Sequence, residues 1–277
     1  MIARRSQVPA ASVILLAAAA AIWFMPFLWM LVASLRPDAA GGADIASLWP
    51  SPRSGFGNFT EAWSSGSFPL WYLNTMLLCA GVLAVQLVTV TLAGYAFARL
   101  DFPGRQAIFY LFLLQLMLVP PVLMVPNLVT LAWLGLYDTL VGVMAPYFAS
   151  AFGVFLMRQT FRTIPRDFEE AALVDGASRL QILWRVLVPL ARPGLVAFSI
   201  VSVAAHWNEF LWPLLAVSSP SNQVLTVGLA SFTMGAESAS QWGLIAAGTA
   251  LVAAPLLAAF VLFQRRFVSS FVFTGIK

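Results

Sequence analysis

Six long stretches without a charged residue divide this chain of 277 residues. They span residues 6–35, 62–98, 106–137, 139–157, 193–208 and 238–264. The hydrocarbon core of a bilayer is about 30 Å thick, so a helix of about 20 apolar residues can cross it. The fifth stretch reaches that length only with its continuation to Leu215, which contains one charged residue, Glu209. The pattern therefore predicts an all-α polytopic membrane protein with six transmembrane helices.

The composition supports a lipid environment. Hydrophobic residues make up 61% of the chain and charged residues 9%, whereas a soluble domain has about 45–50% apolar and about 25% charged residues. The net charge of +4 comes from dispersed arginines without a dense basic stripe, so no nucleic-acid partner is expected. The partner that the composition indicates is the lipid bilayer.

Several kinds of chemistry are excluded by what the chain lacks. With one cysteine and one histidine, Cys79 and His206, it can form no internal disulfide framework and no cluster with metal-ligand spacing. Its only lysine is Lys277, so no phosphate-binding loop of an ATPase is present. We expect neither an enzyme nor a cofactor or metal site.

The distribution of Lys and Arg predicts the orientation. Cytoplasmic segments of membrane proteins carry the excess of these residues. If alternate segments between the six stretches share a side, 13 of the 15 Lys and Arg residues fall on one side. That side holds both termini, so both are expected to be cytoplasmic, and residues 41–67 form an external loop.

Prolines interrupt two of the expected spans. Pro120, Pro121 and Pro126 lie in the third and Pro213 in the fifth. A proline removes a backbone donor and clashes with the preceding turn, so we expect these helices to kink or break. Ordinary packing kinks and a pore-lining or gating role both remain open.

Residues 163–189 form the longest expected cytoplasmic segment between spans, and their pattern indicates two short helices. Pro165 suits a first helical position, and an apolar face follows at helical spacing. Gly176 is placed to end this helix in a left-handed conformation. The residues of the face are Ile164, Phe168, Ala171 and Ala172.

The second expected helix opens on a capping box, Ser178 with Gln181 three residues on. Its apolar face comprises Leu180, Leu183, Trp184 and Leu187. A helix-turn-helix with apolar faces on both arms is typical of a docking element. An amphipathic pair lying on lipid headgroups is the alternative that the pattern leaves open.

This segment resembles the EAA loop of permeases in ATP-binding-cassette importers. The resemblance rests on Glu170-Ala171-Ala172, Gly176 and Pro189, and the sequence departs mildly at Val186 and Val188. In that family the loop forms coupling helices that sit in a cleft of the ATPase subunit. The resemblance therefore implies that ATPase coupling involves Glu169, Glu170, Ala171, Ala172, Asp175, Gly176 and Pro189.

Motifs elsewhere resemble the maltose-transporter class of carbohydrate permeases, from about residue 70 to Lys277. They are Asn74-Thr75, residues 96–100, 102–105, 135–139 and 207–214, and Gly275-Ile276-Lys277. The resemblance implies a bacterial inner-membrane permease core over residues 70–265. Residues 1–69 precede the core as a first helix and outer loop, and residues 266–277 follow as a cytoplasmic tail.

The same resemblance implies the partners. They are a second, homologous permease, two copies of an ATPase, an external solute-binding protein and a carbohydrate solute. Sequence does not select among mono- or oligosaccharides, polyols and sugar phosphates.

Polar residues within the fifth span mark a candidate solute path. An ionisable side chain inside a span is costly and indicates function. His206 and Glu209, three residues apart, are expected to share a helical face, with Asn208 and Trp212 beside them. A structural role for these residues, such as a contact with the second permease, remains open.

Two other functions compete with the importer. An ion-coupled secondary transporter would use His206 and Glu209 as a proton relay. A non-transporting membrane scaffold would give no solute flux with any partner.

Overall fold

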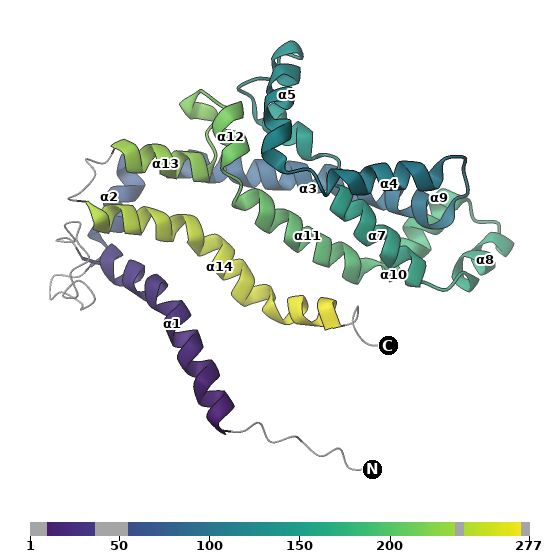
Figure 1. Ribbon diagram of the computed structural model, residues 1–277, viewed down its shortest axis with the longest axis horizontal. Helices are drawn as coiled ribbons and strands as arrows, with labels where there is room; N and C mark the ends of the chain where they lie inside the picture. Colours follow the sequence, from purple (N-terminus) through teal and green to yellow (C-terminus); the bar gives the residue numbers. More distant parts are fainter. Residues whose placement is uncertain (1–9, 37–54, 236–240, 273–277) are drawn as a thin grey trace. The chain divides into compact units, whose positions relative to one another are not determined.

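The computed structural model describes residues 10–36, 55–235 and 241–272. The regular structure in these ranges is helical throughout (Figure 1). The α-helices are α1 Ala10–Ser34, α2 Gly57–Ser65, α3 Phe68–Arg99, α4 Arg105–Gln115, α5 Pro120–Trp133, α6 Leu140–Met144, α7 Ala151–Thr163, α8 Asp167–Val174, α9 Arg179–Ile182, α10 Val188–Leu190, α11 Arg192–Trp207, α12 Leu211–Ala216, α13 Leu225–Gly235 and α14 Trp242–Val272. Short 3-10 helices η2 (Ala145–Tyr147) and η4 (Pro220–Asn222) and a π-helix, η3 (Leu183–Leu187), join them.

Three of these helices are long and apolar enough to cross a membrane, Ala11–Ser34, Phe68–Arg99 and Trp242–Leu262. Three bent pairs also qualify when each pair is taken as one span, which gives up to six spans in the described part of the chain. The pair α4 and α5 is bent by 101°, the pair made of α6 with η2 and α7 by 45°, and the pair 179–190 and α11 by 77°. The prediction of a break at the prolines of the third span is confirmed, because Pro120 and Pro121 follow the 101° bend directly.

The chain divides into two compact units. The first comprises Met1–Phe68 and Leu229–Pro255, and the second comprises Pro69–Gly228 and Leu256–Lys277. In the first unit, Asn58 of α2 donates hydrogen bonds to the carbonyls of Ser34 and Arg36 at 3.0 and 2.9 Å, which fixes α2 against the end of α1. Most of α1 before that end is exposed, as expected for an apolar helix whose solvent is lipid.

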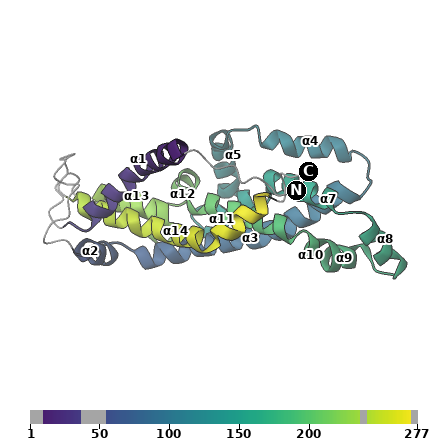
Figure 2. The ribbon, with the colours of Figure 1, turned by 90° about the horizontal axis from the view of Figure 1, so that it is seen from below.

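In the second unit, α7 packs against α4 and α11, as Figures 1 and 2 show. Glycines permit the close approach of neighbouring helices, as is usual in membrane bundles. A Cβ on Gly153 of α7 would lie 2.6 Å from side-chain atoms of both Val90 and Phe198. These contacts bring α3, α7 and α11 into one packed core.

Three boundaries differ from those that the sequence predicts. The expected fourth span is interrupted after η2, where Ser150 caps α7 by accepting a hydrogen bond from the Gly153 amide at 3.1 Å. Helix α7 then continues to Thr163, so Arg158 and Arg162 lie on a helix and not in a loop. Helix α8 begins at Asp167, two residues after Pro165.

Candidate functional site

The turn between α8 and α9 has the geometry that the sequence predicts. Gly176 adopts φ +80°. Its amide donates to the carbonyl of Leu173 at 3.0 Å, and the amide of Ala177 donates to the carbonyl of Ala172 at 2.9 Å. These two bonds form a Schellman motif, which satisfies the last carbonyls of a helix and favours glycine at the left-handed position.

Helix α8 is the first arm of the 163–189 segment, and α9 to α10 form the second. The second arm begins with the expected capping box. The Ser178 amide donates to the Gln181 side chain at 2.8 Å, and the Gln181 amide donates to the Ser178 hydroxyl at 3.4 Å. The arm then widens into the π-helix η3 before α10. Single π turns inside helices occur frequently at functional sites.

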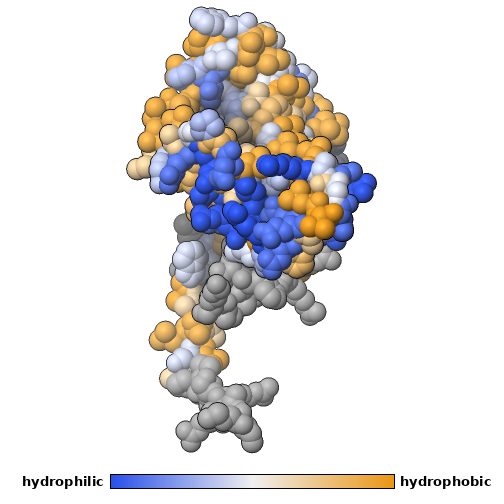
Figure 3. Space-filling view, turned by 90° about the vertical axis from the view of Figure 1, so that its right-hand side faces the viewer, coloured by the Kyte–Doolittle hydropathy of each residue, from blue (hydrophilic) through white to orange (hydrophobic). Residues whose placement is uncertain are grey.

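One side of the 163–189 segment is exposed and apolar. The exposed fraction is 61% for Leu180, 49% for Phe168 and 42% for Trp184. Figure 3 faces the end of the chain where α8 and α9 lie in Figure 1, and it shows a band of hydrophilic residues that contains a hydrophobic patch and lies below a mainly hydrophobic region. Exposed apolar patches with a polar rim mark sites of interaction.

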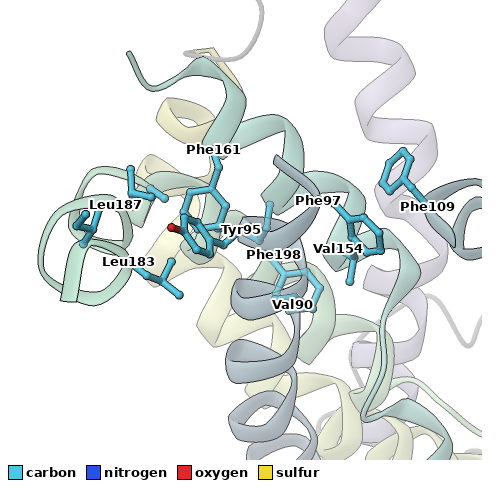
Figure 4. Packing of buried hydrophobic residues seen from close by; sticks show 12 residues of the cluster. Val90, Tyr95, Phe97, Phe109, Val154, Phe161, Leu183, Leu187 and Phe198 are labelled. Carbon is cyan, nitrogen blue, oxygen red and sulfur yellow. The ribbon is translucent and has the colours of Figure 1, made fainter. Parts of the chain in front are cut away.

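The other side of the segment is covered by the chain itself. Leu183 and Leu187 are fully buried, and Figure 4 shows them beside Tyr95 and Phe161. The apolar face expected from Leu180, Leu183, Trp184 and Leu187 is therefore split between an interior and an exposed part. The widened turn of η3 lies where the buried leucines do, and the sequence pattern alone did not predict it.

An ion pair fixes the first arm to the core. Arg99, the last residue of α3, places Nε 2.6 Å from Oε1 of Glu169, and their side chains are 7% and 14% exposed. Nη2 of Arg99 also donates to the carbonyls of Phe161 and Ile164, at and just after the end of α7. A charged group with several such bonds holds its neighbours in one geometry.

The remaining residues expected in ATPase coupling lie differently from Glu169. Glu170, Ala171, Asp175 and Gly176 are exposed, whereas Ala172 and Pro189 are half-buried. Among the described residues, neither Glu170 nor Asp175 has an ion-pair partner. The exposed acidic side chains of Glu170 and Asp175 therefore lie on the same segment as the exposed apolar side chains.

A cavity of about 280 Å³ lies in the second unit, and we call it the polar cavity after the amide and imidazole side chains in its otherwise mostly apolar lining. Its lining comes from the breaks of three helices, residues 115–120, 146–152 and 206–212, together with Gln86 of α3 and part of α5. Irregular backbone at membrane depth is tolerated where it lines a cavity or is buried in protein. Of the four residues predicted for the solute path, His206 and Trp212 line this cavity, whereas Asn208 and Glu209 are not among its lining residues.

Hydrogen bonds fix one wall of the cavity. Gln86 is 3% exposed; its Nε2 donates to the Tyr147 carbonyl at 2.7 Å and its Oε1 accepts from the Ser202 hydroxyl at 2.6 Å. His206 places Nδ1 2.6 Å from the Ser202 carbonyl and packs edge-on against the Tyr147 ring at 4.6 Å. The wall is therefore held from α3, η2 and α11 together.

The expectation that His206 and Glu209 share a helical face is wrong, because α11 ends at Trp207 and α12 begins at Leu211. Pro213 has no amide to donate to the Glu209 carbonyl, which instead accepts from the Thr226 hydroxyl at 2.6 Å. Asn208 is exposed and donates to the Ala204 carbonyl at 2.7 Å. The Glu209 side chain accepts from the Trp212 amide at 3.4 Å, so it organises the break.

Asp138, which the sequence did not mark as a site residue, joins two loops. Its carboxylate accepts from the amides of Ser218 and Ser219, both at 2.9 Å, and from the Ser219 hydroxyl. Its carbonyl accepts from Asn222 at 2.6 Å, and its φ is +57°. These bonds lower the pKa of Asp138 from 3.8 to about 2. A signal was present in the 135–139 motif, but its partners lie some 80 residues away along the chain.

Asn74, at the start of α3, holds the same loop from another side. Its amide donates to the carbonyls of Ser221 and Gln223 at 2.9 and 2.8 Å. Thr75 accepts from the Leu225 amide at 2.8 Å. The motif Asn74-Thr75 thus fixes the segment that leads into α13.

We expect Asp138→Asn to loosen this loop without unfolding the spans. The amide keeps the size of the carboxylate but removes its charge, and hydrogen bonds to charged groups are the stronger ones. Exchange of the Ser218 and Ser219 amides, measured by hydrogen–deuterium exchange, should accelerate by about tenfold or more. Because the pKa is lowered, the carboxylate stabilises the loop above pH 3.8 and loses this effect as the pH falls toward 2. Unchanged exchange in the variant at neutral pH would contradict the assignment.

Apolar helices with a cavity at their breaks, and an exposed glycine turn between α8 and α9, are typical of a membrane transport subunit. The chain belongs to the family described as binding-protein-dependent transport system inner membrane component, whose model matches residues 90–272. It is accordingly a multi-pass protein of the inner membrane.

Three relatives have stated transport roles. The chain is 31% identical to the diacetylchitobiose uptake system permease protein NgcG of Streptomyces coelicolor, over 90% of this chain and 82% of the relative. It is 30% identical to the arabinooligosaccharides transport system permease protein AraQ of Bacillus subtilis, over 92% and 91%. It is 32% identical to the sn-glycerol-3-phosphate transport system permease protein UgpE of Pectobacterium atrosepticum, over 78% and 79%.

Solved structures share the fold. A chain of a bacterial ABC transporter involved in the import of the acidic polysaccharide alginate superposes with a TM-score of 0.79 at 24% identity, covering 93% of this chain and 95% of that one. A chain of a bacterial alginate ABC transporter in complex with its alginate pentasaccharide-bound periplasmic protein gives a TM-score of 0.64 at 16% identity. At these identities the likeness establishes the fold alone.

Proposed function

We propose that this chain is the permease subunit of an ATP-driven carbohydrate importer. The family establishes transport with a binding protein, and two of the relatives carry the names of oligosaccharide systems. The proposal that import is driven by ATP rests on the exposed apolar side of α8 and α9, next to the turn at Gly176. A chain without a phosphate-binding loop needs a separate ATPase, and this surface is where it docks.

In the proposed assembly the chain pairs with a second permease and rests on two ATPase subunits. Closure of the ATPase on ATP moves α8 to α10, and Arg99 passes that motion to α3. The spans then turn from inward-open to outward-facing, where the solute-binding protein delivers its load. Hydrolysis resets them.

The solute path in this proposal includes the polar cavity. His206 and Trp212 line it, and Asn208 and Glu209 hold the break between α11 and α12 at its edge. Transporters commonly bind solutes where helices are discontinuous. Three broken helices meet at this cavity, which is why we place the path there.

Both termini are cytoplasmic in this assembly, since 13 of the 15 Lys and Arg residues lie on the side that holds them. We expect a reporter fused after Lys277 to report cytoplasm, and one inserted within residues 41–67 to report the exterior. An exterior signal from the C-terminal fusion would reverse the orientation and remove α8 and α9 from the ATPase side.

Docking is tested by replacing exposed apolar side chains on the second arm. Leu180→Ser and Trp184→Ser should leave the chain in the membrane at a normal level and reduce co-purification of the ATPase subunit. Phe56→Ser is the matched control, because Phe56 is 73% exposed in the first unit, outside the 163–189 segment. Retention of the ATPase by both loop variants would mean that this surface lies on lipid headgroups.

A further inference from the structure

The polar cavity has no charged residue in its lining. Its polar lining comprises Gln86, Gln115, Asn127, Tyr147, Ser150, His206 and Trp212, and no Asp, Glu, Lys or Arg is among the lining residues. The arginines of the second unit lie between Arg99 and Arg192 and at Arg265 and Arg266, in the segments that the sequence assigns to the cytoplasm. A desolvated anion is costly unless a cation pairs with it.

Two amide side chains at the cavity are available to a ligand. Gln115, at the end of α4, and Asn127, on α5, form no hydrogen bond with another described residue. Each offers one carbonyl acceptor and two N–H donors. A hydroxyl group, which both donates and accepts, is complementary to such an amide.

The histidine adds an acceptor. A backbone carbonyl can only accept, so the 2.6 Å contact of the Ser202 carbonyl places a proton on Nδ1 of His206. Nε2 of the neutral ring is then an acceptor. An acceptor suits a hydroxyl donor and disfavours a phosphate or carboxylate oxygen.

We infer that the part of the path lined by this chain takes a neutral, hydroxyl-rich solute, namely an uncharged saccharide or polyol. Uronates and sugar phosphates are disfavoured at this cavity. The inference rests on the proposed function and narrows its substrate class. It separates this chain from the glycerol-phosphate and alginate systems that it otherwise resembles.

The test is ATP-driven uptake by the complete transporter in proteoliposomes. The probes are neutral saccharides and polyols, each paired with its phosphorylated or uronate form. We expect uptake of a neutral member and at least tenfold less of its anionic partner. Gln115→Ala and Asn127→Ala should reduce that uptake at least tenfold, while loaded binding protein still stimulates ATP hydrolysis.

The controls distinguish a failure of the neutral-solute inference from a failure of the proposed importer function. Asn127→Arg introduces a cation into the cavity and should raise uptake of the anionic partner relative to the neutral member. Preferred uptake of the anionic form by the wild-type protein, or normal uptake by both alanine variants, would overturn the neutral-solute inference and leave the importer intact. Absence of ATP-driven uptake for every pair would overturn the proposed function itself, and the inference with it.

Arg99 joins α8 to the ends of α3 and α7. Arg99 contacts three segments at once, Glu169 of α8 and the carbonyls of Phe161 and Ile164. Both side chains of the ion pair are mostly buried, so water screens it little. Helix α8 therefore cannot turn freely relative to α3.

We propose that Arg99 is a positioning residue that makes α8 and α3 move as one body. The inference deepens the proposed coupling role of the 163–189 segment. It also gives Glu169 an internal role, as the residue through which the exposed arm is held. Exposed Glu170 and Asp175 remain available to the ATPase.

The measurement is solute imported per ATP hydrolysed in the reconstituted transporter. Arg99→Ala and Glu169→Gln should keep the ATPase bound and stimulated, and lower import per ATP at least tenfold. Arg99→Lys keeps the charge and a donor and should restore much of it. The double variant Arg99→Glu with Glu169→Arg restores the ion pair but not the bonds from Arg99 to the carbonyls of Phe161 and Ile164. It should therefore restore import per ATP only in part.

If Arg99→Ala fails to fold, the isosteric variant Glu169→Gln still tests whether the ion pair couples α8 to α3. Import per ATP at the wild-type value in Glu169→Gln, or a parallel fall of import and hydrolysis, would reduce the pair to a structural role. Normal import by Gly176→Pro as well would instead refute the coupling function of the whole segment.

Discussion

Gly176→Pro should abolish solute import while the protein still inserts into the membrane at a near-normal level. Proline fixes φ near −65°, whereas Gly176 has φ +80° and donates its amide to Leu173. Both the direction of the second arm and one bond of the Schellman motif are lost. The turn lies outside the spans, so their insertion is spared. Reconstituted uptake, ATP hydrolysis and membrane level are measured together.

Gly176→Asn is the matched control. Asparagine enters the left-handed region more readily than other residues with a Cβ, and a Cβ at this position meets nothing within 4 Å. We expect this variant to retain most of the import. If the proline variant imports as well as the asparagine variant, the turn has no part in coupling.

Gly94→Ala should destabilise the folded protein by about 1–3 kcal/mol, because it overpacks a tight helix contact. A Cβ on Gly94 would lie 2.7 Å from Cβ of Met157 and 3.1 Å from the backbone nitrogen of Arg158. These atoms belong to the body of α7, so α3 and α7 must separate. The thermal midpoint in detergent should fall, and Gly94→Leu should give little folded protein.

Gly81→Ala on the same helix is the control. Its Cβ would meet only the end of the Met144 side chain, with Sδ at 2.8 Å, and a flexible side chain can move. Helix propensity favours alanine equally at both positions. An equal thermal midpoint for the two alanine variants would show that α3 and α7 do not pack as described.

Features encoded by neighbouring residues could be predicted from the sequence. The turn at Gly176 and the capping box of Ser178 and Gln181 depend on bonds between residues at most five apart. The break at Pro120 and Pro121 follows from amides that proline lacks. Each of these features could therefore be predicted from the sequence alone.

Features that depend on distant residues could not be predicted. Whether Leu180 or Leu183 is buried is decided by Tyr95 and Phe161 on other helices. The hydrogen bonds of Asp138 span some 80 residues, and those of Arg99 more than 60. A helical period identifies an apolar face but not which part of it another element covers.

Of the residues that line the polar cavity, only His206 and Trp212 were singled out from the sequence. His206 stood out as the single histidine within a span, and Trp212 stood in a recognisable motif. Gln86, Gln115 and Asn127 are uncharged residues on three different helices, and nothing local distinguishes them. Glu209 stood out by its charge, yet it holds the break between α11 and α12, because Pro213 cannot continue the helix.

The most direct measurement is uptake by proteoliposomes that contain the chain, its partner permease, the ATPase and loaded binding protein. With ATP inside and no ion gradient, the solute should accumulate, and a protonophore should leave uptake unchanged. Uptake that continues without ATP and stops with the protonophore would contradict this account and favour a proton relay through His206 and Glu209.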